Sequence, residues 1–116
     1  MGLAACGTTP CVECATSGPY AQGVETVHAS QKPDAIVMQG DDLRFQPPTV
    51  TVRLGGQVRW TNAGSTPHNV TFDTFRASGT MNSGDDYQLR FDVAGTFHYV
   101  CTFHAPGMAG TVVVTR

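Results

Sequence analysis

Four side chains that can bind a soft metal ion lie in two short segments of this 116-residue chain. Cys101, His104 and Met108 fall within eight residues, and His68 lies in the segment Thr66-Pro67-His68-Asn69-Val70. Thiolate and thioether donors suit Cu(I), and imidazole suits both oxidation states of copper. Two imidazoles, one thiolate and a weak axial thioether make up the ligand set of blue-copper electron-transfer sites. We therefore expect these four residues to bind one copper ion that gains and loses a single electron.

Each of these residues has a simpler interpretation when taken alone. Cys101 can be a small buried hydrophobic residue and Met108 a flexible core side chain, but the four donors together favour a metal site. A methionine ligand argues against zinc, which prefers sets closed by further thiolates or carboxylates. No paired carboxylates or open ligand position point to hydrolysis, so we do not expect an enzyme. The remaining candidate ligands are less well placed in the sequence: His28, His98 and Met81.

The elements that carry these residues are predicted to be β-strands. From Pro33 onward apolar and polar residues alternate, and successive side chains of a strand point to opposite faces. The alternation is clear over 49–52, 57–60, 69–72, 87–91 and 97–101, and a valine-rich strand follows over 111–115. No segment has a helical stripe. The chain is therefore predicted to be all-β, an antiparallel β-sandwich, with a long loop over 73–86.

Composition limits the classes of function. Apolar residues make up 41% of the chain and charged residues 14%, which favours an ordered globular domain. The formal net charge is −2 and the basic residues are scattered, so no electrostatic feature favours a nucleic-acid partner. No apolar run is long enough to span a bilayer.

The first thirty residues have the composition of a flexible tether. Leu3-Ala4-Ala5-Cys6 resembles a bacterial lipobox, although the charged and apolar regions of a signal peptide do not precede it; a chance match in an alanine-rich segment is the alternative. Cys11 and Cys14 form a C-x-x-C pair, for which a local disulfide is the expected state. We predict that residues 1–30 tether a domain of residues 31–116 to a membrane surface through lipidated Cys6.

Residues 45–116 resemble the plastocyanin, pseudoazurin and amicyanin group of cupredoxins. The matching motifs are Phe45-x-Pro47, Val50-x-Val52-x-x-Gly55, Val58-x-Trp60-x-Asn62, Pro67-His68-Asn69-Val70, Gly95-Thr96-Phe97-x-Tyr99-x-Cys101-x-x-His104 and Gly107-Met108-x-Gly110. The resemblance implies a Greek-key β-sandwich with one type 1 copper at one end. It also implies that His68, Cys101 and His104 are equatorial ligands, that Met108 is the axial ligand, and that Asn69 ties the two ligand loops together.

Two departures from that pattern affect the expected function. Three residues separate His104 from Met108, whereas plastocyanins and pseudoazurins usually have four and amicyanins two. Val100 stands where plastocyanins carry a tyrosine next to the cysteine, and no acidic cluster accompanies it, which argues against a photosynthetic plastocyanin role.

The sequence around His104 predicts how the electron leaves. Phe103, Ala105 and Pro106 surround this histidine with apolar surface, and such patches mark interaction sites. We expect redox partner proteins to dock there on a monomeric, extracytoplasmic electron carrier. A copper carrier or storage protein is the alternative function, and a fragment of a multicopper oxidase is a third, which the absence of a second histidine cluster in the sequence disfavours.

Overall fold

The computed structural model describes residues 23–73 and 76–116, and in this part of the chain it contains nine strands and no helix. The strands are β1 (Val24–Thr26), β2 (Ala35–Gln39), β3 (Phe45–Gln46), β4 (Thr49–Arg53), β5 (Gly56–Asn62), β6 (Thr71–Phe72), β7 (Asp86–Phe91), β8 (Gly95–Val100) and β9 (Ala109–Thr115). Among these residues, no helix has the length and apolar character needed to cross a membrane.

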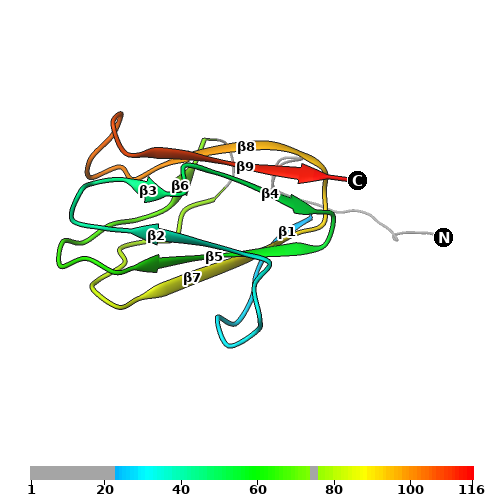
Figure 1. Cartoon of the computed structure of the whole chain (residues 1–116), viewed down its shortest axis with the longest axis horizontal. Helices are drawn as coiled ribbons and strands as arrows, with labels where there is room; N and C mark the ends of the chain where they lie inside the picture. The colour runs from blue at the N-terminus through cyan, green and yellow to red at the C-terminus, as the bar shows by residue number, and fades with distance from the viewer. Residues whose placement is uncertain (1–22, 74–75) are drawn as a thin grey trace.

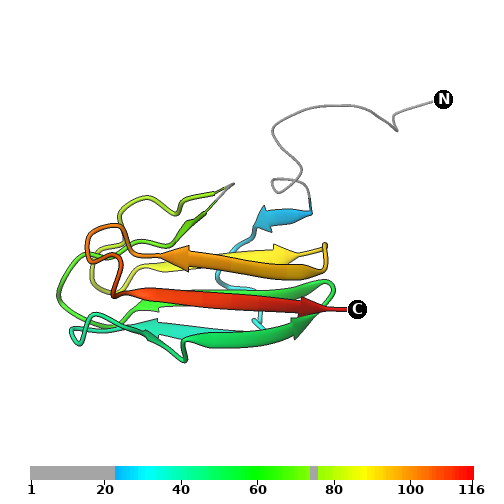
Figure 2. The same cartoon turned by 90° about the horizontal axis from the view of Figure 1, so that it is seen from above.

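The strands form two sheets that face each other (Figures 1 and 2), one in the order β1-β7-β5-β2-β3 and the other in the order β4-β9-β8-β6. The all-β sandwich predicted from the alternation is confirmed. Two pairs, β2 with β5 and β4 with β9, are parallel, so the sheets are mixed and not wholly antiparallel as predicted. A period of two shows which face a residue occupies, but it carries no information on strand direction.

Aromatic side chains between the sheets fix the strand that leads to the predicted cysteine ligand. The ring of Trp60 on β5 is fully buried and lies 5.4 Å from that of Tyr99 on β8 and 5.9 Å from that of Phe72 on β6, between ring centroids. Phe45 packs edge-on against Tyr99 at 4.7 Å. Fully burying one such side chain contributes about 1.5–3 kcal/mol. This packing therefore places the end of β8 firmly inside the sandwich.

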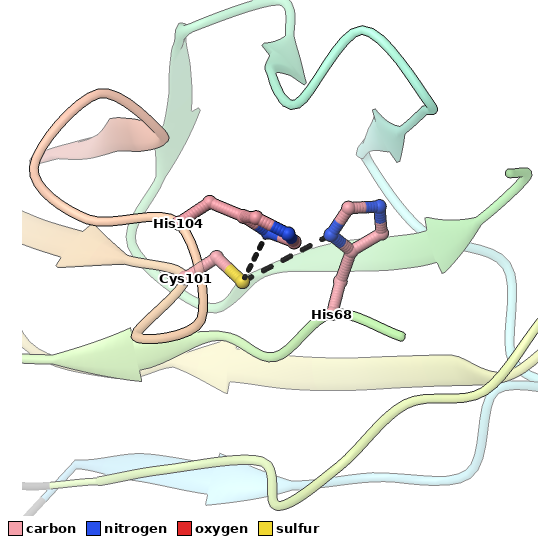
Figure 3. Close-up of side chains that lie close together, drawn as sticks. All are labelled: His68, Cys101 and His104. Atoms are coloured by element: carbon pink, nitrogen blue, oxygen red, sulfur yellow. Dashed lines mark hydrogen bonds between the residues drawn. The ribbon is translucent and has the colours of Figure 1, made fainter. Parts of the chain in front are cut away.

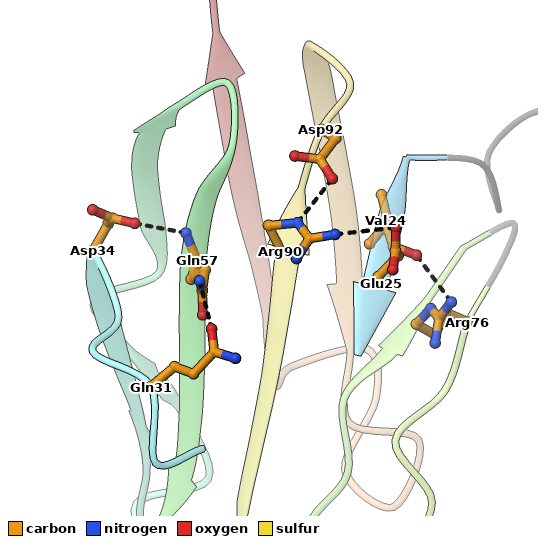
Figure 4. Close-up of polar contacts among 8 residues, drawn as sticks. All are labelled: Val24, Glu25, Gln31, Asp34, Gln57, Arg76, Arg90 and Asp92. Carbon is orange, nitrogen blue, oxygen red and sulfur yellow. Dashed lines mark hydrogen bonds and ion pairs between the residues drawn. The ribbon is translucent and has the colours of Figure 1, made fainter. Parts of the chain in front are cut away.

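The first strand lies in the segment that the sequence predicted to be a tether. Val24 is fully buried, and Glu25 forms an ion pair of 3.1 Å with Arg90 on β7 (Figure 4). Arg76 donates a hydrogen bond of 3.0 Å to the carbonyl of Val24. Strand β1 therefore packs on the sheet although it precedes the boundary predicted after residue 30. At three residues it is too short to show an alternating pattern. The predictions for Cys6, Cys11 and Cys14 concern residues outside the described part of the chain.

Polar side chains also attach the segment before β2 to the outer face of the first sheet. Gln57 on β5 donates its backbone N–H to Asp34 at 2.8 Å and its side-chain amide to Gln31 at 3.0 Å (Figure 4). Gln88 on β7 donates a further hydrogen bond of 3.1 Å to the Gln31 carbonyl. The fold therefore continues through the segment between β1 and β2.

Candidate metal centre

Three predicted ligands meet at one end of the sandwich, where the β2–β3 and β8–β9 loops lie (Figure 1). The sulfur of Cys101 lies 3.9 Å from Nδ1 of His68 and 3.5 Å from Nδ1 of His104, and the three donor atoms all lie within 4.8 Å of one another (Figure 3). Cys101 and His68 are fully buried, and His104 is half-buried. The chain thus brings a thiol and two imidazoles together from two separate segments.

These distances fit donors that share a single small metal ion. With the bond lengths known for zinc, an ion of similar size, a sulfur at about 2.3 Å and a nitrogen at about 2.0–2.1 Å lie roughly 3.5–3.8 Å apart at tetrahedral to trigonal angles. The observed sulfur–nitrogen separations are 3.5 and 3.9 Å. A thiolate with two imidazoles is a donor set that suits copper. The arrangement can therefore hold copper with little movement of the protein.

The other ring nitrogen of His68 has a partner that leaves Nδ1 free for the metal. Nε2 of His68 lies 3.1 Å from the carbonyl oxygen of Gly40, which can only accept a hydrogen bond, so the ring proton belongs on Nε2. Burial and repulsion from His104 lower the pKa of His68, and the bond to Gly40 opposes this only in part. The imidazole is thus held neutral, with its Nδ1 lone pair facing Cys101.

The loop after β8 carries three of the four predicted ligands. Cys101 continues the inward-facing series of Phe97 and Tyr99 on β8, and all three side chains are buried. The backbone N–H of His104 donates to the Cys101 carbonyl at 3.1 Å, that of Met108 to the His104 carbonyl at 3.3 Å, and that of Cys101 to the Met108 carbonyl at 3.0 Å. These three backbone bonds hold Cys101, His104 and Met108 close together in one tight loop.

Met108, the predicted axial ligand, is 1% exposed and lines a pocket of about 370 Å³ together with His104. The rest of that pocket comes from the neighbouring loops: Leu43, Arg44, Phe45, Gln46, Pro48, Gly107 and Ala109. Met108 is thus buried beside a histidine of the donor group.

A short backbone pairing holds His68 in place. The N–H of His68 donates to the Met81 carbonyl at 3.0 Å, and the N–H of Met81 donates to the His68 carbonyl at 2.7 Å. The side-chain amide of Asn62 donates to the carbonyls of Thr66 and Met81, each at 2.9 Å. Met81 lies far along the chain from the 101–108 segment, and no sequence pattern indicated its pairing with His68.

Asn69 links the two ligand-bearing segments, as the resemblance implied. Its Nδ2 donates to the hydroxyl of Thr102 at 2.7 Å, and its Oδ1 accepts from the Thr102 backbone N–H at 3.0 Å. The Gln39 side chain donates to the Asn69 carbonyl at 3.2 Å. The residues following His68 and Cys101 are therefore fastened to each other, which fixes the spacing of the two predicted ligands.

Several exposed apolar side chains lie near His104. Phe103 is 52% exposed, and Ala105 and Pro106 are also exposed. Leu43, which the sequence analysis did not single out, is 39% exposed and lines the pocket beside His104. Its backbone has φ of 60°, an uncommon conformation for leucine that no local sequence pattern signals.

Comparisons with known proteins agree with this geometry. A family model described as copper-binding proteins of the plastocyanin/azurin family matches residues 33–115. Chloroplastic plastocyanin from Tetradesmus obliquus is 36% identical over 85 residues, which cover 62% of this chain and 59% of that sequence. Amicyanin from Paracoccus versutus is 35% identical over 113 residues, 84% of this chain and 83% of that one. The structure of a reduced Cu(I) amicyanin variant at pH 4 superimposes with a TM-score of 0.70 and 28% identity, covering 80% of this chain and 99% of that chain.

Proposed function

The chain belongs to the plastocyanin/azurin family of copper-binding proteins, and on this basis we propose that it carries single electrons between redox partners outside the cytoplasm. Its cofactor is one copper ion, for which His68, Cys101 and His104 are the proposed equatorial ligands and Met108 the proposed axial ligand. The observation that carries this proposal is the meeting of two imidazole nitrogens with the buried Cys101 sulfur, at 3.9 and 3.5 Å.

The residues around the proposed ligands favour electron transfer by holding the donor atoms in fixed positions. When bound, copper supplies a centre that takes up and returns one electron. The hydrogen bond of 3.1 Å from His68 to Gly40 and the two bonds between Asn69 and Thr102 hold the donor atoms in one arrangement. A site that barely rearranges on a change of oxidation state exchanges electrons fast. Burial of Cys101 keeps water from the sulfur.

The proposed exit for the electron is the half-buried ring of His104. Around it, Phe103, Ala105 and Pro106 are exposed and offer an apolar surface for a redox partner. Interfaces of this kind are small, often below about 1,200 Å², which permits rapid dissociation after each transfer. We also propose that the protein acts as a monomer, in which this surface is free.

The amicyanin and plastocyanin relatives support a location outside the cytoplasm. Attachment to the outer face of a membrane through lipidated Cys6 is a further part of the proposal, and it rests on the Leu3-Ala4-Ala5-Cys6 segment alone. Mass spectrometry of the protein expressed from its full-length gene tests this part separately, because lipidation adds acyl chains to the cysteine.

A copper carrier or storage protein is the alternative function. Such a protein needs exchangeable copper in an open site, whereas Cys101 and His68 are fully buried here. Burial of two donors therefore favours the electron carrier.

Titration of the purified protein with Cu(II) tests the proposal. An electron carrier gives an intense blue thiolate-to-copper absorption, a reversible one-electron couple and slow loss of copper to a chelator. Cys101→Ser abolishes the blue colour, and His98→Ala, a change on the outer face of β8, leaves it intact. Weak colour together with rapid copper loss from the unaltered protein would support the carrier or storage function instead.

A further inference from the structure

The turn after β2 touches the ring of His68. The carbonyl oxygen of Gly40 accepts a hydrogen bond from the Leu43 backbone N–H at 3.1 Å and lies 3.1 Å from Nε2 of His68. A carbonyl has two lone pairs and can accept both bonds. The position of this turn therefore sets the orientation of the His68 ring.

The next residue of the same turn holds the segment that leads to His68. The carboxylate of Asp41 accepts from the Ser65 backbone N–H at 2.8 Å, from the Ser65 hydroxyl at 3.1 Å and from the Thr66 backbone N–H at 3.3 Å. The bond from the Ser65 backbone is the main cause that lowers the pKa of Asp41. One side chain thus fixes the two residues that precede Pro67 and His68.

The two segments also pack closely against each other. A Cβ atom on Gly64 would lie 2.6 Å from Oδ1 and 2.9 Å from the backbone nitrogen of Asp41, so any side chain there would push the segments apart. The Ala63 backbone N–H donates to the Gln39 carbonyl at 2.8 Å. Residues 39–41 and 63–66 are therefore joined along their length.

From these contacts we infer that Asp41 is a positioning residue for the copper ligand His68. Its carboxylate ties the segment that supplies the His68 backbone to the turn whose Gly40 carbonyl orients the His68 ring. Main chain and ring are then held by the same turn and cannot move independently. The inference rests on the proposed role of His68 as a ligand. The link concerns His68 because its one side, Thr66, precedes His68 by two residues, and its other side adjoins the Gly40 carbonyl that contacts the His68 ring.

Three variants of the copper-loaded protein separate the contacts of Asp41 from its charge. Asp41→Ala removes the charge and the acceptor oxygens, Asp41→Asn removes the charge but keeps one acceptor, and Asp42→Ala removes the same charge from the exposed neighbouring residue. Loss of a partner that orients a ligand costs about 10–100-fold in metal affinity. We expect Asp41→Ala to lose copper to a chelator about tenfold faster than the unaltered protein, with Asp41→Asn and Asp42→Ala within about twofold of it.

A second measurement follows the imidazole directly. In the Cu(I) protein, the Nε2 proton of His68 is observable by NMR, and its exchange with solvent should be faster in Asp41→Ala than in Asp42→Ala. Gly64→Ala places a methyl group against the Asp41 carboxylate and should also speed exchange of the His68 Nε2 proton with solvent.

Equal copper loss from Asp41→Ala and Asp42→Ala would overturn the inference, as would equal loss from Asp41→Asn and Asp41→Ala, since charge would then be the cause. If the unaltered protein bound no copper, the proposed function would fail. The Nε2 exchange measured in the metal-free proteins would still decide whether Asp41 positions His68.

Discussion

Gly110 on β9 lies directly across from Tyr99 on β8, and a Cβ atom placed on Gly110 would come within 2.4 Å of the Tyr99 ring carbon Cζ and hydroxyl oxygen. The tyrosine ring occupies the space that a side chain at position 110 needs. Tyr99 in turn contacts Trp60 and Phe45 in the core. Strands β8 and β9, which flank the loop 101–108, therefore pack closely because position 110 has no side chain.

Gly110→Ala should destabilise the domain by overpacking. Forcing an extra methyl group into a packed core costs about 1–3 kcal/mol, and the free energy of unfolding in urea measures it. Gly107→Ala is the matched control, because a Cβ there meets nothing closer than the His104 carbonyl oxygen at 3.8 Å. A surface change of that kind alters stability by about 0.5 kcal/mol at most. Equal stability of the two variants would contradict the packing described here.

The stability of the domain should fall at alkaline pH because of Tyr99. Burial raises the pKa of Tyr99 to about 12, and the neighbouring Trp60 offsets part of this rise. The Tyr99 hydroxyl and the Trp60 ring N–H form no hydrogen bond of standard geometry. The unfolded chain loses this proton near about pH 10 and the folded chain only near pH 12, so stability declines as the pH rises through this window. The loss is on the order of 2–3 kcal/mol.

Urea unfolding at several values between about pH 9 and 12 tests this decline. Burial raises the pKa of Tyr87 as well, so Tyr99→Phe should remove part of the decline and not all of it. A variant whose stability falls as steeply as that of the unaltered protein would show that Tyr99 is not the cause.

Asn69→Ala should weaken copper binding and the fold together. The substitution removes the bond to the Thr102 hydroxyl and leaves the Thr102 N–H without its acceptor. Each lost hydrogen bond costs about 0.5–1.5 kcal/mol of stability, and copper should dissociate about tenfold faster. Thr71→Val, which removes only a 3.0 Å bond from the Thr71 hydroxyl to Asn69, should have a smaller effect. Stopped-flow transfer of copper to a chelator compares the three proteins.

Phe103→Asp should slow electron exchange between two molecules of the protein while copper stays bound. Exchange between copies needs their His104 edges to approach, and the substitution places a negative charge on each apposed surface. We expect a fall of about tenfold at low salt, measured by NMR line broadening in mixtures of Cu(I) and Cu(II) protein. Val93→Asp makes the same change at an exposed apolar residue in the β7–β8 turn, at the opposite end of the sandwich. Equal slowing by both variants would exclude a specific surface at His104.

Much of the metal centre could be predicted because its donors are chemically distinctive. Cys101, His104 and Met108 fall at the end of an alternating strand, and the alternation correctly placed His68 in the interior, where it is fully buried. The predicted strand over 69–72 is shorter in the structure, where only Thr71 and Phe72 belong to β6. The neighbouring His68 pairs with Met81 as an isolated bridge.

Contacts between distant segments could not be predicted from one sequence. The partner of the His68 ring is a backbone carbonyl, and every residue has one, so nothing marks Gly40 in advance. Asp41 belongs to a turn segment, Gly40-Asp41-Asp42, whose composition indicates a turn and no more. Strand direction in the β4–β9 pair depends on how the chain crosses between sheets, which alternation within a strand does not record.

The compact loop 101–108 has a consequence for how this protein family can diversify. Of the four proposed ligands, three lie on one stretch of chain that is closed by its own backbone bonds between Cys101, His104 and Met108. Insertions or deletions between His104 and Met108 can therefore move the thioether relative to the remaining donors and leave β8 and β9 in register. Three residues separate His104 from Met108 in this chain, so a change in the length of this segment would move Met108 and leave the core between the sheets in place.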